Sequence, residues 1–113
     1  MTSNAFSWKG SADLDTVELE DFANAVYAGQ CKVIDVREPH EFATGHVPGA
    51  VNIPLSRFDP AEAPLDKPVV LICQAGGRSR TALNKARAIG REDVRHYAGG
   101  TNGWRAAGGE IAS

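Results

Sequence analysis

Residues 69–79 read VVLICQAGGRS, and this stretch decides the fold class. Four apolar residues in a row, residues 69–72, predict a short buried strand. The strand runs directly into Cys73 and then into a loop that contains the adjacent glycines Gly76 and Gly77. A helical pattern follows over about residues 79–89 and ends at Gly90. The stretch is therefore a strand, a cysteine, a glycine-containing loop and a helix.

Strands and helices alternate on both sides of this stretch. Further strands are predicted over residues 32–36, 50–53 and 94–97, and helical segments over residues 19–28, 38–43 and 104–107. Such alternation predicts an α/β fold with a mainly parallel sheet. Ligands of these sheets bind at the carboxyl ends of the strands, where the pattern locates Cys73.

The chain of 113 residues has room for one domain, which we expect over residues 14–113 after a loose N-terminal arm of residues 1–13. No apolar run reaches the roughly 20 residues that cross a bilayer. The first ten residues lack a cationic start and an apolar block, so the cytoplasm is the default location, although a processed exported form would look the same. Two cysteines form neither a disulfide framework nor a zinc pattern, and no metal or cofactor is expected.

The net charge of −2 conceals an uneven distribution of charge. With no basic surplus overall, nucleic-acid binding is not expected. Residues 73–91 nevertheless contain five basic residues and no acid, namely Arg78, Arg80, Lys85, Arg87 and Arg91. This run predicts either a local positive field that concentrates small anions or simply a solvated basic helix face.

The loop after Cys73 is suited to activating a thiol. Successive backbone N–H groups in a glycine-containing loop can converge on one point, and the first N–H groups of the next helix lack intrahelical partners. These dipoles favour the thiolate, which is the nucleophilic form of cysteine. Arg78, a cation at a helix N-terminus, indicates either a bound anion or an outward, solvated side chain. Cys31 opens a strand and is interpreted as an inert thiol.

Three motifs in order resemble those of the rhodanese (thiosulfate sulfurtransferase) family, of the single-domain type. The resemblance covers about residues 14–109. The motifs are DVREPHEF at 35–42 with GHVPGAVNIP at 45–54, the loop CQAGGRS at 73–79, and GGTNGW at 99–104. The related phosphatases separate cysteine and arginine by five residues, whereas four separate Cys73 from Arg78, so phosphatase activity is not expected.

The resemblance implies a fold, a reaction and a set of site residues. It implies a five-stranded parallel sheet with helices on both faces. The Cys73 thiolate would attack the outer sulfur of a small anionic donor such as thiosulfate and pass the sulfur, held as a persulfide, to a thiophilic acceptor such as cyanide or a thiol. The residues that would surround the persulfide are Gln74, Ala75, Gly76, Gly77 and Arg78, and Arg78 would also help to hold the donor. Asp35 and Arg37 would form a structural ion pair.

Two alternatives stay open at this point. The first is a sulfur-relay module that accepts persulfide sulfur from a partner protein, such as a cysteine desulfurase, and passes it on. The second is a non-catalytic rhodanese-like interaction module, which is the weaker alternative because such modules often lack the cysteine.

Overall fold

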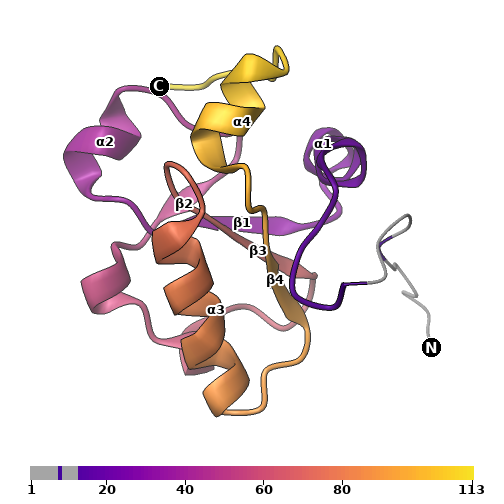
Figure 1. Ribbon diagram of the computed structural model, residues 1–113, viewed down its shortest axis with the longest axis vertical. Coiled ribbons are helices and arrows are strands. Elements are labelled where there is room, and N and C mark those ends of the chain that lie inside the picture. The colour runs from indigo at the N-terminus through magenta and orange to yellow at the C-terminus, as the bar shows by residue number, and fades with distance from the viewer. Residues whose placement is uncertain (1–7, 9–12) are drawn as a thin grey trace.

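The computed structural model describes residue 8 and residues 13–113, and its elements follow the predicted alternation (Figure 1). Apart from Trp8 and Asp13, the predicted N-terminal arm lies outside the described residues. The helices are α1 (Leu19–Ala28), α2 (Pro39–Ala43), α3 (Gly77–Ala88) and α4 (Gly100–Ala106). The strands are β1 (Lys32–Asp35), β2 (Val51–Asn52), β3 (Val69–Ile72) and β4 (Val94–His96), and two 3-10 turns, Leu55–Arg57 and Pro60–Glu62, precede β3. No helix within the described part of the chain is long and apolar enough to cross a membrane.

The four strands form one parallel sheet in the order β2-β1-β3-β4. Strand β3 lies inside the sheet, paired with β1 on one side and with β4 on the other. Because all strands run in the same direction, the residues that follow β1 and β3 emerge at the same edge of the sheet. Cys73 follows β3 at this edge, as the sequence predicted.

The expected fifth strand is reduced to a single bridging residue. Thr16 pairs in parallel with His96 of β4, supported by hydrogen bonds from the Val17 N–H to the His96 carbonyl and from the His96 N–H to the Asp15 carbonyl. Helix α1 begins only three residues after Thr16, so the chain leaves the sheet before a longer ladder can form. The count of five strands was therefore one too high, although the segment lies where an outer strand would be.

The sheet is buried on both faces, and the side chains of β3 are divided between them. Val69 and Leu71 pack in one cluster with α3, whereas Val70 and Ile72 pack in the other with Phe22 of α1. All four residues of β3 have no exposed surface. This alternation follows from the two-residue period of a strand. Cys73 continues the series on the α3 face, which points its sulfur toward the start of that helix.

Two helices begin earlier than their apolar patterns predicted. Helix α3 starts at Gly77 because Gly76 adopts a left-handed conformation (φ 103°), which turns the chain directly from the loop into the helix. Helix α4 starts at Gly100, four residues before Trp104. The completely buried indole of Trp104 anchors α4, packing edge-to-face on Phe22 with ring centroids 5.3 Å apart.

Candidate active site

The Cys73 sulfur accepts hydrogen bonds from backbone N–H groups of the loop and of the first turn of α3. The N–H of Gly76 donates to Sγ at 3.1 Å and the N–H of Ser79 donates to it at 3.2 Å. Cys73 itself is 1% exposed, while Ala75 and Gly77 of the surrounding loop are exposed. The sulfur is thus buried beneath the loop, and peptide groups of the loop surround it.

These donors change the acidity of the thiol. Burial alone raises the pKa of Cys73, because a thiolate is poorly solvated inside the protein. The hydrogen bond with the Ser79 side chain and those from the N–H groups of Ser79, Gly76 and Ala75 outweigh burial, so the pKa lies below that of an ordinary cysteine. The loop around Cys73 therefore favours the thiolate, which is the nucleophilic form of the side chain.

The first turn of α4 holds the loop in this conformation. The Thr101 N–H donates to the Cys73 carbonyl at 2.8 Å, and the Asn102 N–H donates to the Gln74 carbonyl at 3.1 Å. Both carbonyls are thereby held toward α4. Gly100 allows this approach, because a Cβ at this position would collide with the Gln74 backbone. These contacts were not predicted, although the glycine pair before Thr101 was a signal of close backbone approach.

Gln74 and the buried pair Asp35–Arg37 form a brace at one side of the loop. The Arg37 guanidinium donates to both carboxylate oxygens of Asp35, with the shortest contact at 2.8 Å, and neither side chain is more than 1% exposed. Its remaining donors reach the Gly45 carbonyl at 2.9 Å and the Gln74 side chain at 3.1 Å. The Gln74 amide in turn donates to Asn102. The ion pair therefore links β1, the turn after α2 and the loop.

Arg78 lies in the first turn of α3 and is bound by a carboxylate of this chain. Its guanidinium donates to the two oxygens of Glu41 in α2 at 2.7 and 2.9 Å. These hydrogen bonds lower the pKa of Glu41 to about 2. The same carboxylate accepts the Glu38 N–H at the start of α2, so one residue caps that helix and neutralises the cation of the loop.

Three further cations of the basic run, Arg80, Arg87 and Arg91, are also paired with acids. Arg80 and Arg87 both contact the Asp15 carboxylate, at 3.1 and 3.3 Å, and Arg91 contacts Asp93 at 2.7 Å. The hydrogen bond from Arg80 is the main cause that lowers the pKa of Asp15. Of the two alternatives for this run, a local positive field is therefore the less favoured, because most of its charges are offset by carboxylates.

Two buried residues, Ser79 beside the sulfur and His96 behind Ser79, were not recognised as part of the site. The Ser79 hydroxyl lies 3.5 Å from Sγ and 2.8 Å from Nδ1 of His96. Ser79 closes the loop motif and could have been identified from its position there. His96 comes from β4, 17 residues later, and only the tertiary structure brings its ring to the Ser79 hydroxyl.

The environment of the second cysteine, Cys31, shifts its pKa in the opposite direction. Cys31 precedes β1, and burial raises the pKa of its thiol to about 11. The two thiols therefore differ in pKa, which is lowered for Cys73 and raised for Cys31.

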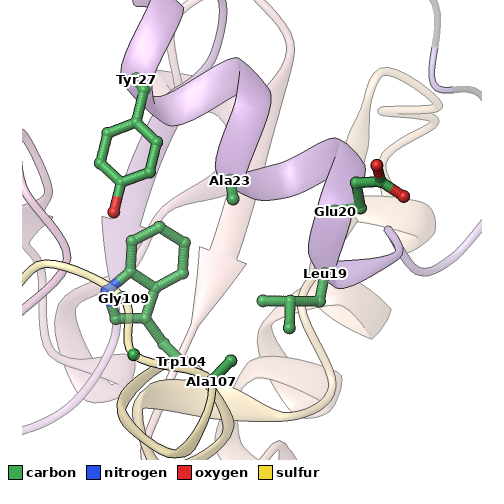
Figure 2. Close-up of a pocket in the computed structure, with 8 residues that line it drawn as sticks. Leu19, Glu20, Ala23, Tyr27, Trp104, Ala107 and Gly109 are labelled. Atoms are coloured by element: carbon green, nitrogen blue, oxygen red, sulfur yellow. The ribbon is translucent and has the colours of Figure 1, made fainter.

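A groove between α1 and the C-terminal part of the chain is separate from the sulfur site. Figure 2 shows Tyr27 of α1 beside the Trp104 indole, with Leu19 and Ala107 further along the groove. None of residues 73–78 lines the groove, and neither cysteine nor histidine is among its lining residues. Within residue 8 and residues 13–113, no group of three or more His, Cys, Asp or Glu side chains could hold a metal ion.

Comparison with known proteins places the chain in a family. The model of the rhodanese-like domain matches residues 18–107. Among curated relatives, the human thiosulfate:glutathione sulfurtransferase is 33% identical over 109 residues, which cover 82% of this chain and 95% of that protein. An uncharacterised protein of Synechocystis is 42% identical over 78 residues, which cover 67% of this chain and only 44% of the relative.

Other relatives are larger proteins. MOCS3 of Drosophila ananassae, named an adenylyltransferase and sulfurtransferase, is 29% identical over 103 residues, which cover 82% of this chain and 23% of that protein.

Among solved structures, a rhodanese-related protein from Thermoplasma volcanium superposes with a TM-score of 0.77 at 27% identity and covers 87% of this chain. That alignment includes 97% of the Thermoplasma chain.

Proposed function

Because this chain belongs to the rhodanese-like domain family, we propose that it is a sulfurtransferase in which Cys73 carries the transferred sulfur. The observation that carries the proposal is the convergence of the Gly76 and Ser79 N–H groups on the cysteine sulfur. A site with several amide donors and a single sulfur at its centre is suited to a sulfur anion, because the donors are fixed before the charge develops.

The proposed reaction has two displacement steps. The Cys73 thiolate attacks the outer sulfur of thiosulfate, the sulfur–sulfur bond of the donor breaks, and sulfite leaves with the bonding electron pair. The product is a Cys73 persulfide whose outer sulfur carries the negative charge. A nucleophilic acceptor then attacks that outer sulfur: cyanide becomes thiocyanate, or a thiolate becomes a persulfide, and the Cys73 thiolate is restored. No outside oxidant or reductant is needed.

The loop residues have distinct proposed roles. The backbone N–H groups of residues 74–78, together with that of Ser79, surround the outer sulfur and stabilise its charge. Gly76, with a left-handed φ of 103°, permits the tight turn that points these groups inward, and Gly77 then begins α3. Arg78 adds a cationic charge near the sulfur, although its binding to Glu41 leaves less of that charge for a donor. Asp35 and Arg37 act as structural support.

Mass spectrometry tests this proposal directly. After incubation with thiosulfate and removal of the excess, the protein is expected to gain one sulfur atom, located on the peptide that contains Cys73. The variant Cys73→Ser is expected to gain none, while the matched control Cys31→Ser gains sulfur as the wild type does. Sulfur found on Cys31, or no gain in the wild type, would contradict the proposal.

One observation favours the sulfur-relay alternative for the identity of the donor. The two cations nearest the loop, Arg37 and Arg78, are both held by carboxylates, so the site attracts small dianions less than the sequence suggested. A persulfide delivered by a partner protein depends less on such attraction. Steady-state transfer from thiosulfate to cyanide, compared with transfer from a persulfidated protein donor, separates the two donors. Slow turnover with thiosulfate beside fast loading from the protein favours the relay.

A further inference from the structure

Ser79 connects the proposed nucleophile to a buried histidine. Its hydroxyl oxygen lies 3.5 Å from the Cys73 sulfur and 2.8 Å from Nδ1 of His96. The three residues are almost fully buried, with Ser79 at 0%, Cys73 at 1% and His96 at 2% exposure. They lie on three different elements, since Cys73 follows β3, Ser79 belongs to α3 and His96 ends β4.

The Ser79 hydroxyl has one hydrogen and three possible acceptors. These are the Cys73 sulfur, Nδ1 of His96 and the Gly76 carbonyl, which lies 3.3 Å away. If the hydrogen points to His96 or Gly76, the hydroxyl presents only lone pairs to a thiolate. If it points to the sulfur, it gives the thiolate a charge-assisted hydrogen bond. Whether Nδ1 of His96 carries a hydrogen therefore decides whether the imidazole competes with the sulfur for the Ser79 hydrogen.

The surroundings of the imidazole select one tautomer. Nε2 of His96 is buried and makes no hydrogen bond with any group of residue 8 or residues 13–113. A neutral imidazole carries its hydrogen on either Nδ1 or Nε2. In either tautomer Nδ1 and the Ser79 oxygen, 2.8 Å apart, share a hydrogen bond, so the tautomers differ at Nε2. A hydrogen on Nε2 would be a buried donor without a partner, which is less tolerated than a bare acceptor nitrogen at the same place. The Nδ1–H tautomer is thus favoured.

We propose that His96 is a positioning residue, which donates its Nδ1–H to the Ser79 oxygen and so turns the Ser79 hydrogen toward the Cys73 sulfur. With Nδ1 acting as donor, the remaining acceptors are the Gly76 carbonyl and the sulfur. A thiolate is the stronger acceptor of the two because it is charged. The inference rests on the proposed role of Cys73 as the nucleophile.

Burial and a nearby cation keep the imidazole of His96 neutral. Burial is the main cause that lowers the pKa of His96, and the Arg80 guanidinium of α3 lowers it further. Asp15 and Asp13, from the segment that precedes α1, act in the opposite direction but are outweighed. At neutral pH the imidazole therefore has a single N–H, and the nitrogen that carries it decides whether His96 donates to Ser79 or accepts from it.

The pH profile of Cys73 alkylation tests the arrangement. His96→Leu removes the donor and keeps an apolar volume in the core, and we expect the alkylation rate near pH 6 to fall about tenfold, with the midpoint of the profile moving upward. Ser79→Ala is expected to have a similar effect. The double variant should add almost nothing to either single change, because the two residues act through one hydrogen bond. His96→Asn, whose amide can donate from near the Nδ1 position, is expected to recover most of the rate.

Contrary results would overturn either the positioning role of His96 or the proposed function of Cys73, and they can be told apart. An unchanged profile in His96→Leu, additive effects in the double variant, or no recovery in His96→Asn would overturn the positioning role. A failure of sulfur uptake from any donor, with the alkylation profiles as expected, would overturn the proposed function and leave the positioning of the hydroxyl intact.

Nitrogen NMR of the unmodified protein provides a readout that does not depend on any variant. With labelled histidine, Nδ1 of His96 is expected to show the shift of a protonated ring nitrogen at pH 7.5, and Nε2 that of a bare one. The opposite assignment would overturn the inference, since Ser79 would then have to donate to the imidazole.

Discussion

Replacing Gly100 with alanine is expected to disable the loop around Cys73 while the protein remains folded. Gly100 opens α4 with φ 67°, and its Cα faces the backbone of the loop. A Cβ at this position would lie 2.6 Å from the Gln74 carbonyl carbon and 2.8 Å from the Ala75 nitrogen. The Gln74 carbonyl oxygen would be closer still. Ordinary contacts of a Cβ begin at 3.4 Å, so the Gln74 peptide would have to move by at least about 0.8 Å.

This movement affects activity more than it affects stability. The left-handed conformation costs alanine about 1–2 kcal/mol, of which about 0.4–1 kcal/mol is offset by the lower entropy of the unfolded chain. Crowding adds a cost of about 1–3 kcal/mol. A displacement of nearly 1 Å at groups that stabilise a reacting atom can lower a rate about 100-fold. We therefore expect a roughly 100-fold slower sulfur uptake by Cys73.

Gly49→Ala is the matched control. Gly49 has a comparable φ of 82°, but no atom of the described residues lies within 4 Å of the Cβ that would be added. This variant carries the same backbone strain and no contact with the loop. Single-turnover sulfur uptake, followed by mass spectrometry, and urea denaturation are measured for both variants. Normal uptake in Gly100→Ala, or an equal loss in Gly49→Ala, would refute the reasoning.

Two further changes test the ion pairs near the site. Glu41→Gln should lower the free energy of unfolding by at most about 1 kcal/mol. Since Arg78 lowers the pKa of Glu41 from 4.5 to about 2, this difference should be fully present above about pH 4.5, shrink between these two values and vanish below about pH 2. Urea denaturation at a series of pH values measures it. Asp35→Asn leaves Arg37 buried without its counter-charge, so urea denaturation should show a free energy of unfolding about 3–5 kcal/mol lower. Asp93→Asn breaks a more exposed ion pair with Arg91 and should lower the free energy of unfolding by less than about 1 kcal/mol. Similar losses in the last two variants would contradict the structural role of the buried pair.

Local patterns predicted the framework of the fold because they depend on neighbours in sequence. Four apolar residues before Cys73 predicted β3, and the spacing of Leu19, Phe22 and Val26 predicted α1 up to Gly29, which adopts the left-handed conformation (φ 69°). The strand order, by contrast, rests on pairings between distant segments. The fifth strand came only from the family resemblance, and its reduction to the bridge at Thr16 depends on where α1 begins.

The charge environment of the site could not be predicted from the basic run alone. Arg80 is paired with Asp15, 65 residues earlier, and Arg78 is paired with Glu41, 37 residues earlier. Composition cannot reveal which acids fold against a helix. His96 was missed for the same reason, since a histidine in a predicted strand gives no sign that its ring will face Ser79.

Titration of the Cys73 thiol, with Cys31 replaced by serine, tests the central claim most directly. The account holds that backbone N–H groups and the Ser79 hydroxyl stabilise the thiolate more than burial destabilises it. Thiolate absorbance and the rate of alkylation, measured across pH, are expected to give a midpoint below that of an ordinary cysteine in a short peptide. A midpoint equal to or above that of the peptide would contradict the account.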